Sequence, residues 1–447
     1  MTNIGMELYM LRSKSGISFI DKIAKKNAWL WKAFADWGLT VSLGLLAYPL
    51  FRKTMDKRMF VLGLLTIAVI FLIVIPASII PVQFINLPQI QDRLATSLAC
   101  VSQSTVQAPS ASMLLSPQLI ITFIIFLAGG LAFLIPALLF LNAFGIIIAV
   151  ASSVHFAGGH YNYTGAFNAI NSQVPGAAPI IPGITIPFFA GIISLVIILV
   201  IHEFSHGILA RISKVKIKNT GLLFLLGVIP VGAFVEPSEA KIAKLTNVEQ
   251  NRISIAGVSA NLLATIVFLA IMALFSNYII PSISATHVLV YATAGPGFPA
   301  YNVIAPGSYL LAINNRSISN LTSVGIAESS IAPLSGINVL TNKGDYNLQT
   351  DSQGKIGVYL CESSIVSNSS PINGALNFLF VLVALLFLLN FSIAAVNLLP
   401  IPGFDGWRIY EIEMKDHLKL LYFIEVAVLA AILINVLPLL TYIASVI

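Results

Sequence analysis

Charged side chains are scarce in this chain of 447 residues: Asp, Glu, Lys and Arg make up 9% of it, whereas 57% is hydrophobic. None of these four residue types occurs between Leu94 and His202. Soluble domains carry about 25% charged residues, so the composition excludes a soluble globular protein and a disordered one. Cysteine is equally rare, with two in the chain. That number excludes a disulfide-built scaffold and a zinc cluster of four cysteines.

Long apolar runs lie within the uncharged stretches, and a helix needs about 20 such residues to cross a bilayer. Phe34–Phe51 is a shorter candidate with basic residues on both sides, which conflicts with a simple crossing. Gln118–Val150 is either a long tilted helix or a tight helical hairpin. We therefore expect a mainly α-helical polytopic membrane protein with six to eight spans. The six full-length candidates are Met59–Val82, Gln118–Val150, Pro187–Ala210, Ile253–Ile280, Ala375–Leu398 and Leu420–Ile447.

The distribution of lysine and arginine predicts how the chain is oriented. Gly207–Arg252 holds seven basic and three acidic residues, which predicts a cytoplasmic location. Ser282–Pro371 holds three basic and four acidic residues and three Asn-X-Ser/Thr sequons, which predicts an extracytoplasmic location. Because basic residues serve topology here, the net charge of +6 gives no reason to expect nucleic-acid binding.

The segment Ile201–Gly207, IHEFSHG, continues an apolar run and is expected to be helical. On a helix His202 and His206 share one face and can converge on one zinc ion. Glu203 lies beside that face, where it can take a proton from zinc-bound water and pass it to the leaving amine. The alternative is a chance match to a short motif. However, a central charge in a span costs about 2.5–3.5 kcal/mol, and such residues by default mark a site.

A third zinc ligand is expected from residues 397–406, NLLPIPGFDG, which close the span Ala375–Leu398. The two prolines cannot continue a helix, and the glycines let the backbone turn. Asp405 then lies on an unwound segment at the same membrane depth as His206. That matched depth favours a metal ligand over a solvated turn residue.

Three segments, in their order along the chain, resemble the site-2 protease family of intramembrane zinc metalloproteases: HEFSH in a span, AGVSANLL at 256–263 and NLLPIPGFDG at 397–406. GAFVEP at 232–237 resembles the archaeal and eukaryotic-type members. The resemblance implies a membrane-embedded hairpin at Gly221–Val235 that pairs with unwound substrate. It also implies one Zn2+ per chain and a catalytic Glu203. The implied metal ligands are His202, His206 and Asp405, and the implied substrate or oxyanion residues are Asn261, Asn397, Gly257 and Pro400.

The residues alone support a more modest interpretation of that last group. Asn261 and Asn397 are buried amides that need partners, and hydrogen bonds between helices explain them as well as contacts with substrate do. Gly257 belongs to a stripe of small residues, with Ala260 and Ala264, that lets one helix approach another closely.

The polar segment between the spans resembles a PDZ domain in its pieces Phe298–Tyr301, Ile304–Ser308 and Leu310–Asn315. We expect it to be a small extracytoplasmic PDZ-like α+β insert. PDZ domains capture extended peptides along a sheet edge, and a steric filter at the entrance is the alternative. Either role would admit substrates whose outer part another protease has already trimmed.

The chain then divides into five segments: a basic N-terminal segment with a short first hydrophobic segment (1–58), an accessory transmembrane region with an external loop (59–186), a catalytic core (187–281), the PDZ-like insert (282–371) and a transmembrane region that completes the zinc site (372–447).

The expected function is a zinc metalloendopeptidase that hydrolyses peptide bonds within transmembrane segments of membrane-anchored substrates, as in regulated intramembrane proteolysis. It would be a multi-pass protein of the cell membrane, with the lipid bilayer as its surroundings and the site toward the cytoplasm. A metal transporter and an inactive protease-like scaffold are the alternatives. A transporter would line a path with several polar spans, and a scaffold would lack a ligand or the glutamate.

Overall fold

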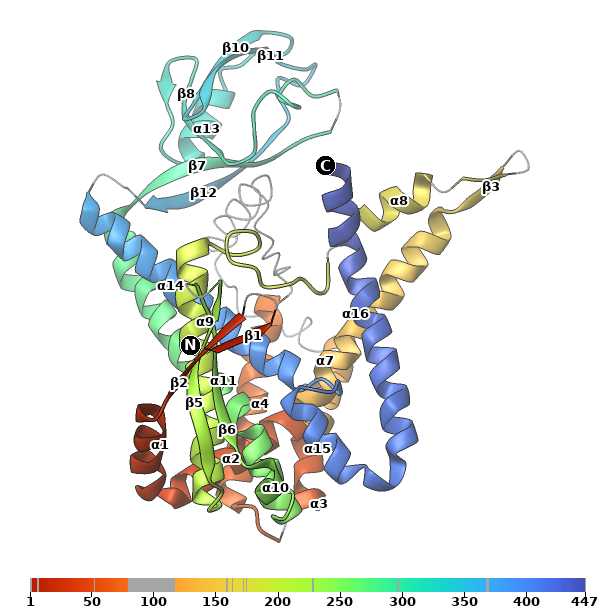
Figure 1. Cartoon of the computed structure of the whole chain (residues 1–447). Coiled ribbons are helices and arrows are strands. Elements are labelled where there is room, and N and C mark those ends of the chain that lie inside the picture. Colours follow the sequence, from red (N-terminus) through yellow and green to blue (C-terminus); the bar gives the residue numbers. More distant parts are fainter. Residues whose placement is uncertain are drawn as a thin grey trace.

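The computed structural model describes residues 2–5, 8–51, 53–78, 117–157, 160–162, 164–171, 173, 175–226, 229–295, 297–366 and 370–446 (Figure 1). Its α-helices are α1 Ser15–Lys25, α2 Ala28–Leu43, α3 Ala47–Phe51, α4 Lys57–Ser78, α7 Pro117–Ser153, α8 Thr164–Asn171, α9 Phe188–Ile212, α10 Glu239–Ile242, α11 Asn247–Leu274, α12 Ile280–Ile283, α13 Leu321–Glu328, α14 Pro371–Asn397, α15 Asp405–Glu413 and α16 Leu418–Val446.

The strands are β1 Thr2–Gly5, β2 Leu8–Ser13, β3 His155–Ala157, β4 His160–Asn162, β5 Ile217–Leu225, β6 Ile229–Pro237, β7 Ser284–Thr293, β8 Ser308–Ile313, β9 Arg316–Ser317, β10 Gly336–Thr341, β11 Gly344–Gln349 and β12 Val358–Val366. Three short turns of other helical types complete the described elements: Gly44–Leu46, Phe275–Ile279 and Lys415–His417.

Within the described residues, six helical segments are long and apolar enough to cross a membrane. This number equals the lower end of the expected range and suits a mainly helical membrane protein. Five of the six segments coincide with expected full-length spans, and the sixth, Ala28–Phe51, contains the shorter candidate Phe34–Phe51. The expected run Met59–Val82 is helical in α4 as far as Ser78, and residues 79–82 lie outside the described part. The six segments are Ala28–Phe51, Leu119–Ser153, Phe188–Ile212, Asn247–Ile283, Pro371–Asn397 and Lys415–Thr441.

The first hydrophobic segment folds back on itself after α2. Gly44, with φ of 58°, ends α2, and α3 leads the chain back until the Asp56 backbone N–H donates to Asp36 Oδ2 over 3.1 Å. Twenty residues of straight helix would separate these positions by about 30 Å. The fold-back removes the conflict over Phe34–Phe51, since its two basic flanks can then lie at one membrane face.

Helix α7 is bent rather than straight. Gly130 has φ of 63° and ψ of −160°, outside the helical region, and joins two helical segments. Gly44 and Gly130 lie against each other, so a Cβ on either would collide with backbone of the other segment. The segment expected at Gln118–Val150 thus consists of two helical pieces joined by a bend, and at Gly130 only glycine accepts both the positive φ and the close approach.

A four-stranded antiparallel sheet in the order β1-β2-β5-β6 packs beside the helices. The hairpin expected at Gly221–Val235 is present as β5 and β6. Strands β1 and β2 were not expected from the sequence. They extend the sheet on the β5 side and leave β6 at the other edge, where it packs against α9 (Figure 1).

The insert is an α+β unit with its own core. Its sheet has the order β11-β10-β8-β7-β12, with β9 paired to β8, and helix α13 accompanies it. The chain enters the insert through α12, which follows α11, and leaves it at the start of α14. The insert therefore lies at one end of α11 and α14 (Figure 1). Its core includes the buried side chains of Val288, Val290, Ile304, Leu310 and Val339.

The contact between the two bends generates a stability prediction. In Gly130→Ala the new Cβ would lie 2.6 Å from Leu43 N and closer still to Ser42, at a positive φ. We expect a loss of about 1–3 kcal/mol from overpacking, seen as a lower midpoint of thermal unfolding in detergent. Gly145→Ala in the same helix is the matched control, because a Cβ there meets nothing within 4 Å. Equal midpoints for both variants would contradict the tight contact.

Candidate metal centre

Helix α9 carries the HEFSH segment in its second half and continues to Ile212. His202 and His206 are one turn apart, and their Nε2 atoms lie 3.2 Å from each other. His202 is buried, and His206 is largely so. The helical spacing therefore points both imidazoles at one place, as the sequence predicts.

Asp405 reaches the same place from another part of the chain. Helix α14 ends at Asn397, the next residues form turns, and Gly403 takes a φ of 97°. Asp405 is the first residue of α15. Its Oδ2 lies 3.1 Å from His202 Nε2 and 3.3 Å from His206 Nε2. The structure thus brings together the three expected metal ligands.

The three ligand atoms form a triangle whose sides are 3.1, 3.2 and 3.3 Å. Zinc bonds of 2.0–2.1 Å in a tetrahedron require ligand atoms about 3.3 Å apart, so the spacing fits a zinc ion. Asp405 Oδ2 is buried and has no hydrogen-bond partner among the described residues. Two imidazoles and one carboxylate leave a fourth position for water or substrate, as in catalytic zinc sites.

Neighbours on α11 orient the two imidazoles. His206 Nδ1 lies 2.7 Å from the Ile253 carbonyl oxygen, so Nδ1 carries the proton and Nε2 presents its lone pair. The amide of Asn261 lies against His202 Nδ1, with Nδ2 at 3.2 Å and Oδ1 without a partner in the described structure. A half-turn of this amide places Oδ1 against the N–H that a metal-bound His202 requires. Asn261 thus contacts a ligand.

Gly257 lets α11 approach the two histidines. A Cβ at this position would lie 2.5 Å from His202 Nε2 and closer still to His206 Nε2. The expected close approach of helices therefore occurs at Gly257 for a specific reason: the imidazoles occupy the space that a side chain would need.

Glu203 points to a different neighbour, the edge strand β6. Its Oε2 accepts the backbone N–H of Val235 over 3.1 Å. The carboxylate is half-buried and lies one residue from the ligand His202. A potential base, adjacent in sequence to a metal ligand, is thus bonded to the strand edge.

A sequence model of peptidase family M50 matches residues 190–432, more than half of the chain. The chain belongs to peptidase family M50. This is the family of the site-2 proteases and is zinc-dependent, in keeping with the resemblance of the motifs. Over 233 residues the chain is also 28% identical to an uncharacterized protein of Methanocaldococcus jannaschii. That match covers 51% of this chain and 58% of the relative, less than two thirds of the relative's length.

The remaining two candidates of this M50 chain are the last residue of α14, Asn397, and Pro400 in the turn that follows. Asn397 donates from Nδ2 to the Ile393 carbonyl of its own helix over 3.0 Å, and Pro400 is buried. Both border the segment that carries Asp405. Their contacts with substrate, and those of Gly257 and Asn261, remain predictions.

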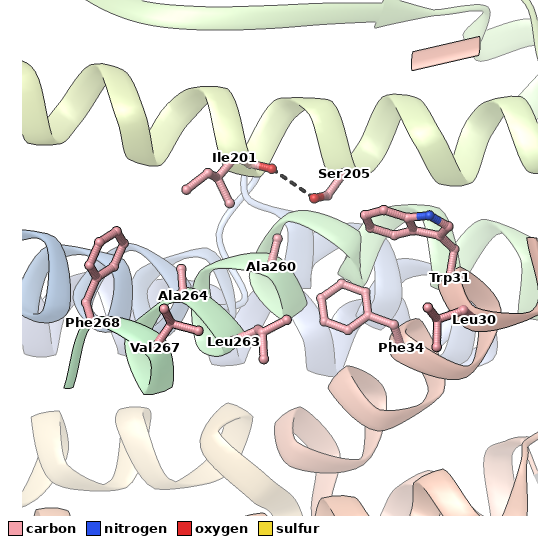
Figure 2. Close-up of a pocket in the computed structure, with 10 residues that line it drawn as sticks. All are labelled: Leu30, Trp31, Phe34, Ile201, Ser205, Ala260, Leu263, Ala264, Val267 and Phe268. Carbon is pink, nitrogen blue, oxygen red and sulfur yellow. Dashed lines mark hydrogen bonds between the residues drawn. The ribbon is translucent and has the colours of Figure 1, made fainter. Parts of the chain in front are cut away.

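An apolar pocket of about 510 Å³ lies on the neighbouring face of α9, between α2 and α11 (Figure 2). Its one hydroxyl, Ser205 Oγ, donates to the Ile201 carbonyl over 2.8 Å. Ala260 and Ala264, the other two residues of the small-residue stripe, line this pocket. The pocket is lined by Leu30, Trp31, Phe34, Ile201, Ser205, Ala260, Leu263, Ala264, Val267 and Phe268.

Gly257 generates a prediction about metal content. In Gly257→Ala the added methyl group displaces the imidazoles, so we expect the purified protein to lose most of its zinc while its circular dichroism remains helical. The number of zinc ions per chain is measured by elemental mass spectrometry. Gly374→Ala, at the start of α14, is the control, because a Cβ there meets nothing within 4 Å. Equal zinc content in the two variants would refute the steric argument.

Proposed function

We propose that this chain is an intramembrane zinc endopeptidase that cleaves membrane-anchored proteins within their transmembrane segments. The observation that carries the proposal is the triangle of His202, His206 and Asp405, with Glu203 beside it. Both histidines lie within the membrane-length helix α9, and Asp405 follows the end of the membrane-length helix α14. Membership of family M50 supports the metalloprotease chemistry. The cleavage of transmembrane segments is inferred from the position of the site.

The residues divide the chemistry between them. Zinc held by the three ligands would acidify water and polarise the scissile carbonyl. Glu203 accepts the proton of the attacking water and delivers it to the leaving amine. Ile253 and Asn261 keep the imidazoles in the orientation that ligation needs. Asn397 is a further candidate donor to the developing oxyanion.

A peptide bond in a transmembrane helix is already hydrogen-bonded and must be unwound before it can react. Strand β6 is an edge of its sheet, and its Val235 N–H contacts Glu203. A substrate segment that adds to this edge exchanges its helical hydrogen bonds for sheet bonds next to the base. Helix-breaking residues near the scissile bond should therefore favour cleavage.

The site would face the cytoplasm and the insert the outside. The exposed basic segments between α9 and α11 support this orientation by the positive-inside rule. Cys361, on β12 of the insert, is disulfide-bonded, which suits an oxidising compartment. At that end of α11 and α14 the PDZ-like insert would screen substrates and admit those already trimmed by another protease.

The two alternatives gain less support. A metal transporter needs polar groups along a path, whereas the described residues contain one group of at least three potential metal ligands. An inactive scaffold would lack part of the machinery, but both histidines, the aspartate and the glutamate are present.

Glu203 separates catalysis from metal binding. In Glu203→Gln the proton carrier is lost while the three ligands stay, so we expect zinc content near that of the parent and cleavage about 10²–10⁴-fold slower. A membrane-anchored reporter substrate in proteoliposomes measures the rate. Glu239→Gln, at an exposed position, is the control. Cleavage at the parental rate by Glu203→Gln would rule out the protease assignment.

The orientation is tested with cysteines at two exposed positions, Lys244 in the basic segment between α9 and α11 and Ser319 in the insert. In intact cells, a membrane-impermeant maleimide should label Ser319→Cys, and Lys244→Cys should react after permeabilisation. The parent chain controls for its two native cysteines. Labelling of Lys244→Cys in intact cells would reverse the proposed topology.

A further inference from the structure

Three consecutive residues at the start of α11 connect the metal centre to the rest of the fold. Ile253 supplies the carbonyl that accepts the proton of His206 Nδ1, 2.7 Å away. The two residues before it, Asn251 and Arg252, make side-chain bonds to other elements. The position of this carbonyl therefore depends on what holds Asn251 and Arg252.

Arg252 forms a buried ion pair with Asp36 of α2. Its Nε and Nη2 donate to the two carboxylate oxygens, each over 2.8 Å, and the side chains are 11% and 2% exposed. Nη2 also donates to the Thr54 carbonyl, and Asp36 Oδ2 accepts the Asp56 N–H. A two-pronged pair of this kind fixes orientation as well as distance. It joins the start of α11 to α2 and to the chain that folds back beside it.

Asn251 holds the helix that begins with the third ligand. Its Nδ2 donates to Glu413 Oε1 over 2.6 Å, and the Asn251 side chain is fully buried. Glu413 is the last residue of α15 and Asp405 is its first. Tyr410 of the same helix donates from its hydroxyl to the Leu398 carbonyl over 3.0 Å. Helix α15 is thus tied to α11 at one end and to the end of α14 in its middle.

We propose that Asn251 and Arg252, with their partners Glu413 and Asp36, are positioning residues of the metal centre. The inference rests on the proposed function, because it assumes that the three ligands hold zinc. His206 and Asp405 come from separate parts of the chain, and a metal tolerates displacements of roughly 0.5 Å. Three adjacent residues of α11 therefore position both the carbonyl that bonds to His206 and the helix that begins with Asp405.

The test compares metal affinity in full-length variants. Arg252→Lys keeps the charge but loses the two-pronged geometry, and Glu413→Leu removes the acceptor of Asn251. We expect each variant to bind zinc about 10–100-fold more weakly, as proteins do when groups that orient metal ligands are lost. The affinity is measured by competition with a chelator. The absorption bands of the cobalt-loaded protein should shift as well. A change confined to folding would leave these bands unaltered.

Two further variants make the comparison specific. Glu413→Gln keeps an oxygen that accepts from Asn251, so it should retain parental affinity and cobalt bands. Arg408, on the same helix α15 as Glu413, forms an exposed pair with Glu239 of α10, and Arg408→Lys should likewise retain parental affinity and cobalt bands. Parental metal affinity and spectra in both Arg252→Lys and Glu413→Leu would overturn the positioning role. Failure of the parent to bind zinc more tightly than Asp405→Asn would overturn the proposed function itself, and the positioning role with it.

Discussion

The convergence of two imidazoles and one carboxylate inside a bundle of apolar helices is the constraint on which the rest of the structure depends. Such groups are expensive in hydrocarbon unless they are paired or bind a cation. Here their three ligand atoms lie within 3.3 Å of one another and the carboxylate oxygen has no hydrogen-bond partner in the described structure. A divalent cation satisfies all three at once, and the surrounding helices hold them at the distance that zinc requires.

Several local departures from regular structure serve this convergence. Helix α14 has to stop before Asp405, and the prolines after Asn397 ensure that it does. Helix α11 has to approach α9 without a side chain, and Gly257 allows it. The bends at Gly44 and Gly130 lie against each other where α7 meets the end of α2, and α2 in turn packs against α11. Each departure depends on a proline or a glycine, whose backbone properties other residue types lack.

Much of the site could be predicted because its signals are local in sequence. The convergence of His202 and His206 follows from their spacing on one helix. The approach of Asp405 follows from its position after the end of another helix at the same membrane depth. The fold-back that brings Asp56 to Asp36 could not be predicted, since the hydropathy of Phe34–Phe51 is that of a short span. Strand β2 was missed because it pairs with β5, more than 200 residues later, and β1 was missed because it depends on β2 for its own pairing. The Asn251–Glu413 contact is equally remote in sequence and leaves no pattern.

The most direct measurement is X-ray absorption at the zinc edge of the purified, folded protein. The structure predicts one zinc ion per chain with nitrogen and oxygen ligands at about 2.0–2.2 Å and the outer-shell scattering of two imidazoles. Folded protein that holds no zinc, or zinc with sulfur scattering at about 2.3 Å, would contradict the assignment of His202, His206 and Asp405 as its ligands.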